Sequence, residues 1–190
     1  MAISTPPYGN YALNRVIDFD RRLMLAVDAW REPPSSPLTL AMRALTRLGD
    51  TDVVIAHGLA LVLTANRGSR SATFAAIAVA LTTTTCLVQL LKRVIRRPRP
   101  SRDLAGLRLL TREPDAFAFP SGHSAAAAAL TTVALVCGHV AAPAEIALAC
   151  GIAVSRVYLG AHYFADVVAG LILGCSLAAA AVLLLPGWGS

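Results

Sequence analysis

Two long stretches without a charged side chain constrain this chain more than any other feature. They cover residues 71–91 and 167–185. An α-helix rises about 1.5 Å per residue, so each stretch is long enough to cross roughly 30 Å of hydrocarbon. The composition agrees, because only 15% of the residues are charged and 56% are hydrophobic, whereas roughly a quarter of an average soluble domain is charged. The sequence therefore predicts helices that span a membrane.

The order of apolar and polar segments predicts an all-α, polytopic membrane helix bundle in a single domain, 1–190. About five transmembrane helices are expected, near residues 53–65, 71–91, 122–138, 143–159 and 162–185. Before them, apolar side chains recur at helical spacing between charged ones over residues 11–30 and 38–48. We expect residues 1–50 to be an interfacial N-terminal segment of amphipathic helices, and residues 51–190 to form the bundle that carries the candidate site.

Counting membrane crossings places the polar segments relative to one another. The loop over residues 92–123 and the turn over residues 155–166 are separated by two expected spans, so both should open on the same side. The turns near residues 66–70 and 137–143 should lie on the other side. Polar groups that are distant in sequence are thus expected to meet at one membrane face.

The first polar segment is strongly basic. Its cationic residues are Lys92, Arg93, Arg96, Arg97, Arg99, Arg102, Arg108 and Arg112. Such a cluster often contacts anionic lipid or follows the cytoplasmic end of a span, and a phosphate-binding site is the sharper alternative. Lys92 and Arg99 are seven residues apart, so a helix continued from the preceding span would place them on one face. Pro98 and Pro100 should end that helix.

The second polar segment precedes an alanine-rich helix. Pro120, Ser121 and Gly122 lead into it, and His123 lies in its first turn. Free backbone N–H groups at a helix start bind anions, and glycine allows a ligand to approach closely. A histidine here is more often a capping residue than an acid when this motif is taken alone.

The third polar segment contains Arg156, His162 and Asp166, which are costly to place near lipid. Because Asp166 follows His162 by four residues, one helix face would let its carboxylate accept the proton of one ring nitrogen. The other nitrogen would remain free as a nucleophile. Taken alone, such a pair is more often structural, but three polar segments on one membrane face favour a phosphoryl-transfer site. No sequence pattern of metal ligands is present.

These motifs together resemble the signature of the type 2 phosphatidic acid phosphatase family, the lipid phosphate phosphatases. The signature reads Lys92, six residues, Arg99-Pro100; then Pro120-Ser121-Gly122-His123; then Ser155-Arg156, five residues, His162, three residues, Asp166. All eleven fixed positions match in order. The resemblance covers residues 92–166 and extends to the helices around them.

The resemblance implies a function and a role for each residue of the motifs. It implies a metal-independent lipid phosphatase, with no cofactor, that forms a phosphohistidine on His162. Asp166 would orient that histidine and His123 would be the general acid. The implied phosphate ligands are Lys92, Arg99, Ser121, Gly122 and Arg156.

Two alternatives stay open from the sequence. One is a lipid-phosphate binding or transport protein on the same fold, which loss of His123, His162 or Asp166 would favour, yet all three are present. The other is a vanadate-dependent haloperoxidase-like enzyme, but those relatives are much longer and soluble. Phosphate release from a phospholipid in the presence of chelator separates the phosphatase from both.

The expected partners are a lipid phosphate substrate and the bilayer, with no nucleic acid. The candidate substrates are phosphatidic acid, phosphatidylglycerol phosphate, a polyprenyl diphosphate and a phosphorylated glycolipid. Gly170 and Gly174 form a G-x-x-x-G pattern, for which we expect packing inside the bundle in preference to a homodimer contact.

The side of the membrane is predicted in two opposite ways. The basic residues would make the active-site side cytoplasmic by the positive-inside rule. The family resemblance instead favours the outer face of a bacterial cytoplasmic membrane, and this is our expectation because chemistry can account for many of those charges.

Overall fold

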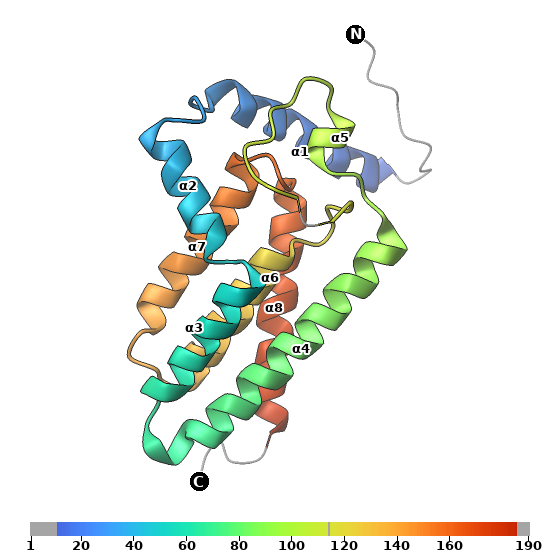
Figure 1. The fold of residues 1–190 in the computed structure, drawn as a ribbon. Coiled ribbons are helices and arrows are strands. Elements are labelled where there is room, and N and C mark those ends of the chain that lie inside the picture. The colour runs from blue at the N-terminus through green and yellow to red at the C-terminus, as the bar shows by residue number, and fades with distance from the viewer. Residues whose placement is uncertain (1–10, 114, 186–190) are drawn as a thin grey trace.

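The computed structural model describes residues 11–113 and 115–185, and within them it is a helical bundle (Figure 1). The helices that form the bundle are α3 (Thr51–Thr64), α4 (Arg70–Ile95), α6 (Gly122–Val136), α7 (Ala142–Tyr158) and α8 (Phe164–Leu184). The other helical elements are α1 (Tyr11–Trp30), α2 (Pro37–Arg47), the short α5 (Pro100–Asp103) and one 3₁₀ turn, η1 (Arg67–Ser69). The predicted all-α architecture and the two amphipathic N-terminal helices are therefore confirmed.

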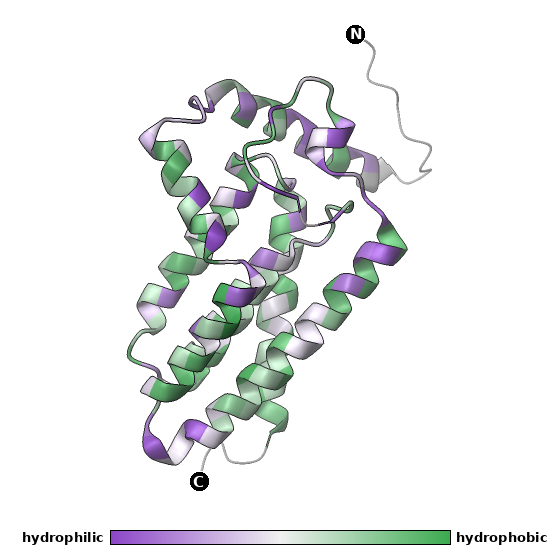
Figure 2. Ribbon diagram, viewed as in Figure 1, coloured by the Kyte–Doolittle hydropathy of each residue, from purple (hydrophilic) through white to green (hydrophobic). Residues whose placement is uncertain are grey.

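Polar and apolar residues separate along the bundle axis. Figure 2 shows hydrophobic residues along most of the five bundle helices and hydrophilic ones gathered at the end where α1, α2 and α5 lie. Two helical stretches, residues 67–95 and 164–184, have the length and hydropathy needed to cross a membrane. Helices α3 and α6 are apolar but shorter. The two crossing stretches contain the charge-free runs noted in the sequence.

Local sequence explains where several helices begin and end. The Ser36 hydroxyl accepts a hydrogen bond from the backbone N–H of Thr39 and caps α2, with proline in its first turn. Ser121 caps α6 in the same way. Helix α4 ends when Arg96 adopts a left-handed backbone conformation at φ 51°. The last helical residue, Ile95, thus lies three residues before Pro98, so the helix ends earlier than the prolines alone predict.

Small residues bring α6 and α8 into close contact. A Cβ atom added at Gly174 would lie 2.1 Å from the carbonyl oxygen of Ala125, and one at Gly170 would lie 2.5 Å from that of Ser121. Only glycine fits at such a distance from a backbone. The G-x-x-x-G pattern therefore packs inside the bundle, as predicted. This contact places the starts of α6 and α8, which carry two of the three motifs, side by side.

The N-terminal helices lie across one end of the bundle (Figure 1). From α1, Arg21 forms a two-pronged ion pair with Asp103 of α5, with N–O distances of 2.9 and 3.0 Å. Helix α2 packs along α7, where Leu45 contacts Gly151. The end of α4, the start of α6, the end of α7 and the start of α8 all meet under these helices, which confirms that the three motifs share one face.

Candidate active site

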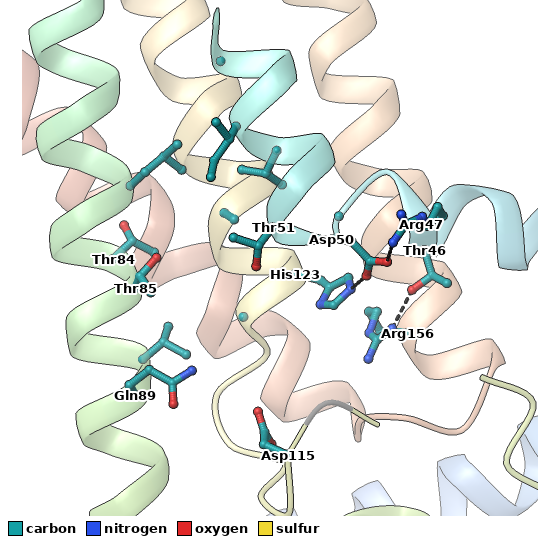
Figure 3. A pocket seen from close by; sticks show the side chains of 18 of the residues that line it. Thr46, Arg47, Asp50, Thr51, Thr84, Thr85, Gln89, Asp115, His123 and Arg156 are labelled. Carbon is teal, nitrogen blue, oxygen red and sulfur yellow. Dashed lines mark hydrogen bonds and ion pairs between the residues drawn. The ribbon is translucent and has the colours of Figure 1, made fainter. Parts of the chain in front are cut away.

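A cavity of about 1540 Å³ opens beneath the N-terminal helices. It runs between α3 and α4, and Figure 3 shows side chains of both helices projecting into it. At one end it is lined by polar residues from all three motifs, which include Lys92, Arg99, Gly122, His123, Arg156 and His162. Its other end has apolar walls. The structure therefore brings the predicted site residues together at the mouth of a deep apolar groove.

Lys92 and Arg99 reach this cavity from different elements. Lys92 lies in the last turns of α4, whereas Arg99 follows Pro98 and precedes α5. The expectation that one continued helix carries both side chains is wrong, because α4 ends at Ile95. They still converge, since both bind Asp115: the Lys92 Nζ lies 2.6 Å from one carboxylate oxygen and an Arg99 nitrogen 2.8 Å from the other.

Asp115 occupies the place that an anionic ligand would take between these two cations. Burial raises the pKa of its carboxyl, but the ion pairs with Lys92 and Arg99 lower it more, so the net pKa lies below the usual value. Asp115 is therefore ionised at neutral pH. A phosphate that binds Lys92 and Arg99 must compete with this carboxylate.

Arg156 supplies a further cation, and part of its guanidinium has no partner. The side chain is 1% exposed. One nitrogen donates to the hydroxyl of Thr46 on α2, while Nε and the other terminal nitrogen have no hydrogen-bond partner within the described residues. Buried donors without acceptors are uncommon and costly. Arg156 lines the cavity, so its positive charge acts on any group that binds there.

His162 lies in the turn between α7 and α8 and is almost completely buried. Its Nε2 is 3.3 Å from an Arg99 nitrogen, so this ring atom faces the cation cluster. Burial lowers the pKa of His162 well below its usual value of 6.5, and the charges of Arg156 and Arg99 lower it further. The imidazole is therefore neutral at neutral pH, as a nucleophile requires.

Asp166 is near His162, but the predicted geometry of the pair is only partly present. His162 precedes α8, which begins at Phe164, so the two residues do not share a helix face. The Nδ1 of His162 and the nearer Asp166 oxygen are 3.8 Å apart, too far for a hydrogen bond. Among the residues that the structure describes, Nδ1 has no hydrogen-bond partner. It points toward the carboxylate side of the site and leaves Nε2 toward the cavity.

Other groups hold the Asp166 carboxylate in place. One oxygen accepts from Arg97 at 2.7 Å, and the other accepts from the backbone N–H of Tyr163 at 2.8 Å as the capping box of α8. Arg97 also binds Asp20 of α1 at 2.8 Å and lies over the Tyr163 ring. Asp166 therefore sits in a fixed network that includes the N-terminal helix.

His123 and its neighbours occupy the start of α6, as predicted. The Nε2 of His123 lies 2.8 Å from a carboxylate oxygen of Asp50, in the α2–α3 connection (Figure 3). This contact fixes the orientation of the ring. Ser121 is fully buried, and its hydroxyl accepts from the Ser124 hydroxyl at 2.9 Å, so it is engaged as the helix cap. Gly122 lines the cavity.

Four residues of the site have no signal in the sequence motifs. Asp20 and Asp50 lie in the N-terminal segment, far from the motifs, and only the fold brings them to Arg97 and His123. Arg97 is one of many basic residues in its loop, and Asp115 belongs to none of the three motifs. Within the described residues, no group of three or more His, Cys, Asp or Glu side chains is placed to hold a metal ion.

The fold and this site define the class of protein. The family model of the PAP2 superfamily matches residues 73–189, more than half of the chain. The chain therefore belongs to the PAP2 superfamily and has the fold of a membrane lipid phosphatase. This membership confirms the predicted polytopic membrane bundle, because a solved structure with this fold is a transmembrane PAP2 type phosphatase.

Individual relatives are similar over different parts of the chain. The decaprenylphosphoryl-5-phosphoribose phosphatase of Mycobacterium tuberculosis is 36% identical over 91 residues, 47% of this chain and 49% of the relative. The chain thus spans about half the length of the curated relatives it matches. The first transmembrane PAP2 type phosphatidylglycerolphosphate phosphatase from Bacillus subtilis is 26% identical, with a TM-score of 0.71 over 88% of this chain and 85% of that one. Aquifex aeolicus LpxE shares the fold, with a TM-score of 0.72 at 24% identity over 85% of this chain and 93% of that one.

Proposed function

We propose that this protein hydrolyses a phosphate monoester or diphosphate on a membrane lipid through a phosphohistidine on His162. The observation that carries the proposal is the cavity itself. It joins three cationic side chains and two histidines to an apolar groove between α3 and α4. A phosphate that remains attached to a lipid tail has this same distribution of charge and hydrocarbon.

The first chemical step forms a bond from His162 to phosphorus. The lone pair of Nε2 attacks the phosphorus atom while Lys92, Arg99 and Arg156 bind the phosphate oxygens in place of Asp115. The bond from phosphorus to the lipid oxygen breaks, and His123 gives that oxygen a proton. Burial and the charge of Arg156 lower the pKa of His123 to about 4, so in this proposal the negative charge of the bound phosphate raises that pKa and lets His123 carry the proton. Asp166 stabilises the positive charge that develops on the His162 ring.

The second step releases phosphate and restores the enzyme. A water molecule attacks the phosphohistidine, and His123 accepts the proton that this water loses. The bond between Nε2 and phosphorus breaks, and inorganic phosphate leaves. In this proposal the cationic side chains balance the charge of the transition state, and the backbone N–H groups at Gly122 and the start of α6 assist them.

We further propose that the site faces the outer side of a bacterial cytoplasmic membrane. The lipid tail then stays in the outer leaflet while its head group enters between α3 and α4. The apolar wall of this groove extends to Phe74 and Leu81 on α4 and Val62 on α3. In this arrangement the substrate stays in one leaflet throughout the reaction.

A trapped intermediate tests the mechanism. The purified protein is quenched with alkali during turnover of a ³²P-labelled lipid phosphate, because phosphohistidine is stable to base and labile to acid. We expect label on His162, its absence in His162→Ala, and turnover that persists in excess chelator. Label on another residue, or His162→Ala with the parent rate, would overturn the proposal.

A second pair of substrates tests the role of His123. His123→Ala should impair hydrolysis of a lipid phosphate much more than that of an aryl phosphate, whose leaving oxygen needs little protonation. Equal losses on both substrates would contradict the assignment of His123 as the acid.

A further inference from the structure

One face of α4 changes character in three steps along the cavity. Eleven residues of α4 line the cavity, and a second row beside this face includes the apolar Ile77, Leu81 and Val88. The face itself consists of Phe74, Ala78, Thr82, Thr85, Gln89 and Lys92. The first two are apolar, the next three are polar and uncharged, and the last is the phosphate-binding cation of the proposed function. The face therefore follows a gradient from hydrocarbon to hydroxyl and amide to charge.

The middle of this face carries polar side chains that form no hydrogen bond with other described residues. Thr85 and Gln89 form no side-chain hydrogen bond within residues 11–113 and 115–185, and both are exposed to the cavity. The adjacent Thr84 is 2% exposed and its hydroxyl, which has no partner in the described part of the chain, is buried behind the cavity wall. Figure 3 shows Thr84, Thr85 and Gln89 on the α4 side, across the cavity from Thr51 at the start of α3.

A threonine inside a helix can donate its hydroxyl proton to the backbone carbonyl oxygen four residues earlier, and Thr83, next to Thr84, does so. Thr83 donates to the carbonyl oxygen of Val79 at 2.8 Å and does not line the cavity. Its neighbours on the cavity side are left free instead. A buried hydroxyl or amide that faces hydrocarbon carries a desolvation cost, so a ligand that fills this region favourably must bring its own polar groups.

The depth of the polar region indicates which part of a ligand it meets. Gln89 and Thr85 lie three and seven residues before Lys92 on the same helix, which is about 4 and 10 Å further from the phosphate-binding end. A lipid whose phosphate is attached directly to its tail anchor would place ester or hydrocarbon groups here. A lipid with a glycerol or sugar between phosphate and anchor would place hydroxyl groups here.

We propose that Thr85 and Gln89 form a head-group subsite that selects lipids with a glycerol or sugar between the scissile phosphate and the lipid anchor. This inference rests on the proposed function, because it takes Lys92 to mark the position of the phosphate. These two side chains pair with the free hydroxyl of the glycerol or those of the sugar, and the apolar residues beyond them contact the tail.

The test compares two lipids that share their acyl chains and differ in the head group. Phosphatidylglycerol phosphate carries a glycerol spacer, and phosphatidic acid carries none. The full chain in mixed micelles should show a higher kcat/KM for the first. Gln89→Leu and Thr85→Val should each lower that value about 3- to 10-fold, the worth of one hydrogen bond. Hydrolysis of phosphatidic acid should fall less than that of phosphatidylglycerol phosphate.

A matched control and a second lipid pair complete the experiment. Thr83→Val makes the same chemical change at a position of α4 that does not line the cavity, and it should alter kcat/KM for neither substrate. Polyprenylphosphoryl-5-phosphoribose and polyprenyl phosphate form the second pair. If Gln89→Leu and Thr85→Val change the ratio of kcat/KM values for this pair and not for the first, the preferred spacer is a pentose and not a glycerol.

The outcomes separate this inference from the proposed function. A wild-type protein that hydrolyses none of the lipids refutes the proposed function and this inference with it. Hydrolysis of both members of each pair with equal efficiency, or equal losses for both in Gln89→Leu and Thr85→Val, refutes the subsite while the phosphatase function stands.

Discussion

At the scale of single residues, the site depends on a buried histidine surrounded by cations. His162 makes its only side-chain hydrogen bond among the described residues through Nε2, with Arg99. Cations next to a histidine disfavour its protonated form, and burial acts in the same direction. The arrangement keeps the nucleophile unprotonated but needs Asp166 to compensate the charge once phosphorus is bound.

This environment predicts how His162 titrates. Since its pKa is lowered from 6.5, the imidazole should stay neutral as the pH falls through 6.5 and gain a proton only well below that value. The measurement is a ¹⁵N histidine spectrum of the detergent-solubilised protein, recorded against pH and assigned with His162→Asn. A titration midpoint at or above 6.5 would contradict the predicted environment.

At the scale of secondary-structure elements, the contact between α6 and α8 positions two of the three motifs. Gly174→Ala would place a methyl group against the Ala125 carbonyl and force the helices apart. Such overpacking should lower the free energy of unfolding by about 1–3 kcal/mol, measured by thermal or denaturant unfolding in detergent.

The control for this substitution is Gly68→Ala. A Cβ atom at Gly68 meets nothing within 4 Å, so stability should be unchanged. If Gly174→Ala kept the parent stability and only changed the oligomeric state, the internal packing role would be wrong.

Helix α1 also acts on the site as an element, through Asp20. This buried carboxylate binds Arg97 and accepts from the backbone N–H of Ala165 at 3.1 Å, so it ties α1 to the start of α8. Arg97 in turn holds Asp166. We expect Asp20→Asn to lower kcat about tenfold with little change in KM, because Asp166 loses its position while the phosphate ligands remain.

Asp18→Asn is the matched control, since Asp18 is exposed on the same helix. A positioning role for Asp20 further predicts that the pH profile of kcat shifts, which a general loss of folded protein would not produce. A drop in folded fraction with unchanged kcat and pH profile per folded molecule would contradict it.

At the scale of the whole molecule, the site lies at one end of the bundle and η1 lies at the other (Figure 1). This separation makes the proposed sidedness testable with single cysteines in a background that lacks the native ones. Arg102, beside the site, and Arg67, in η1, are both exposed. A membrane-impermeant maleimide should label Arg102→Cys in intact cells and should label Arg67→Cys only after the membrane is opened. The reverse pattern would place the site on the cytoplasmic face.

The sequence by itself determined the helices and the end of the bundle at which the three motifs meet. Charge-free runs need a helix in hydrocarbon because the backbone must satisfy its own hydrogen bonds. The helical periods of 11–30 and 38–48 predicted α1 and α2, and counting crossings predicted that Lys92, His123 and His162 meet. Each of these properties follows from local composition or from the order of segments, so one sequence contains it.

Only the tertiary structure decided how those residues are held. Three carboxylates bind basic side chains 23 to 77 residues away in the sequence: Asp20 binds Arg97, Asp50 binds His123 and Asp115 binds Lys92. No local sequence pattern encodes such pairing. Because α4 ends at Ile95 and α8 begins at Phe164, Arg99 and His162 lie in connecting segments and not on the helices that the sequence predicted for them. Packing of whole helices sets these positions, because a side chain finds its partner only where the backbones that carry both are brought together.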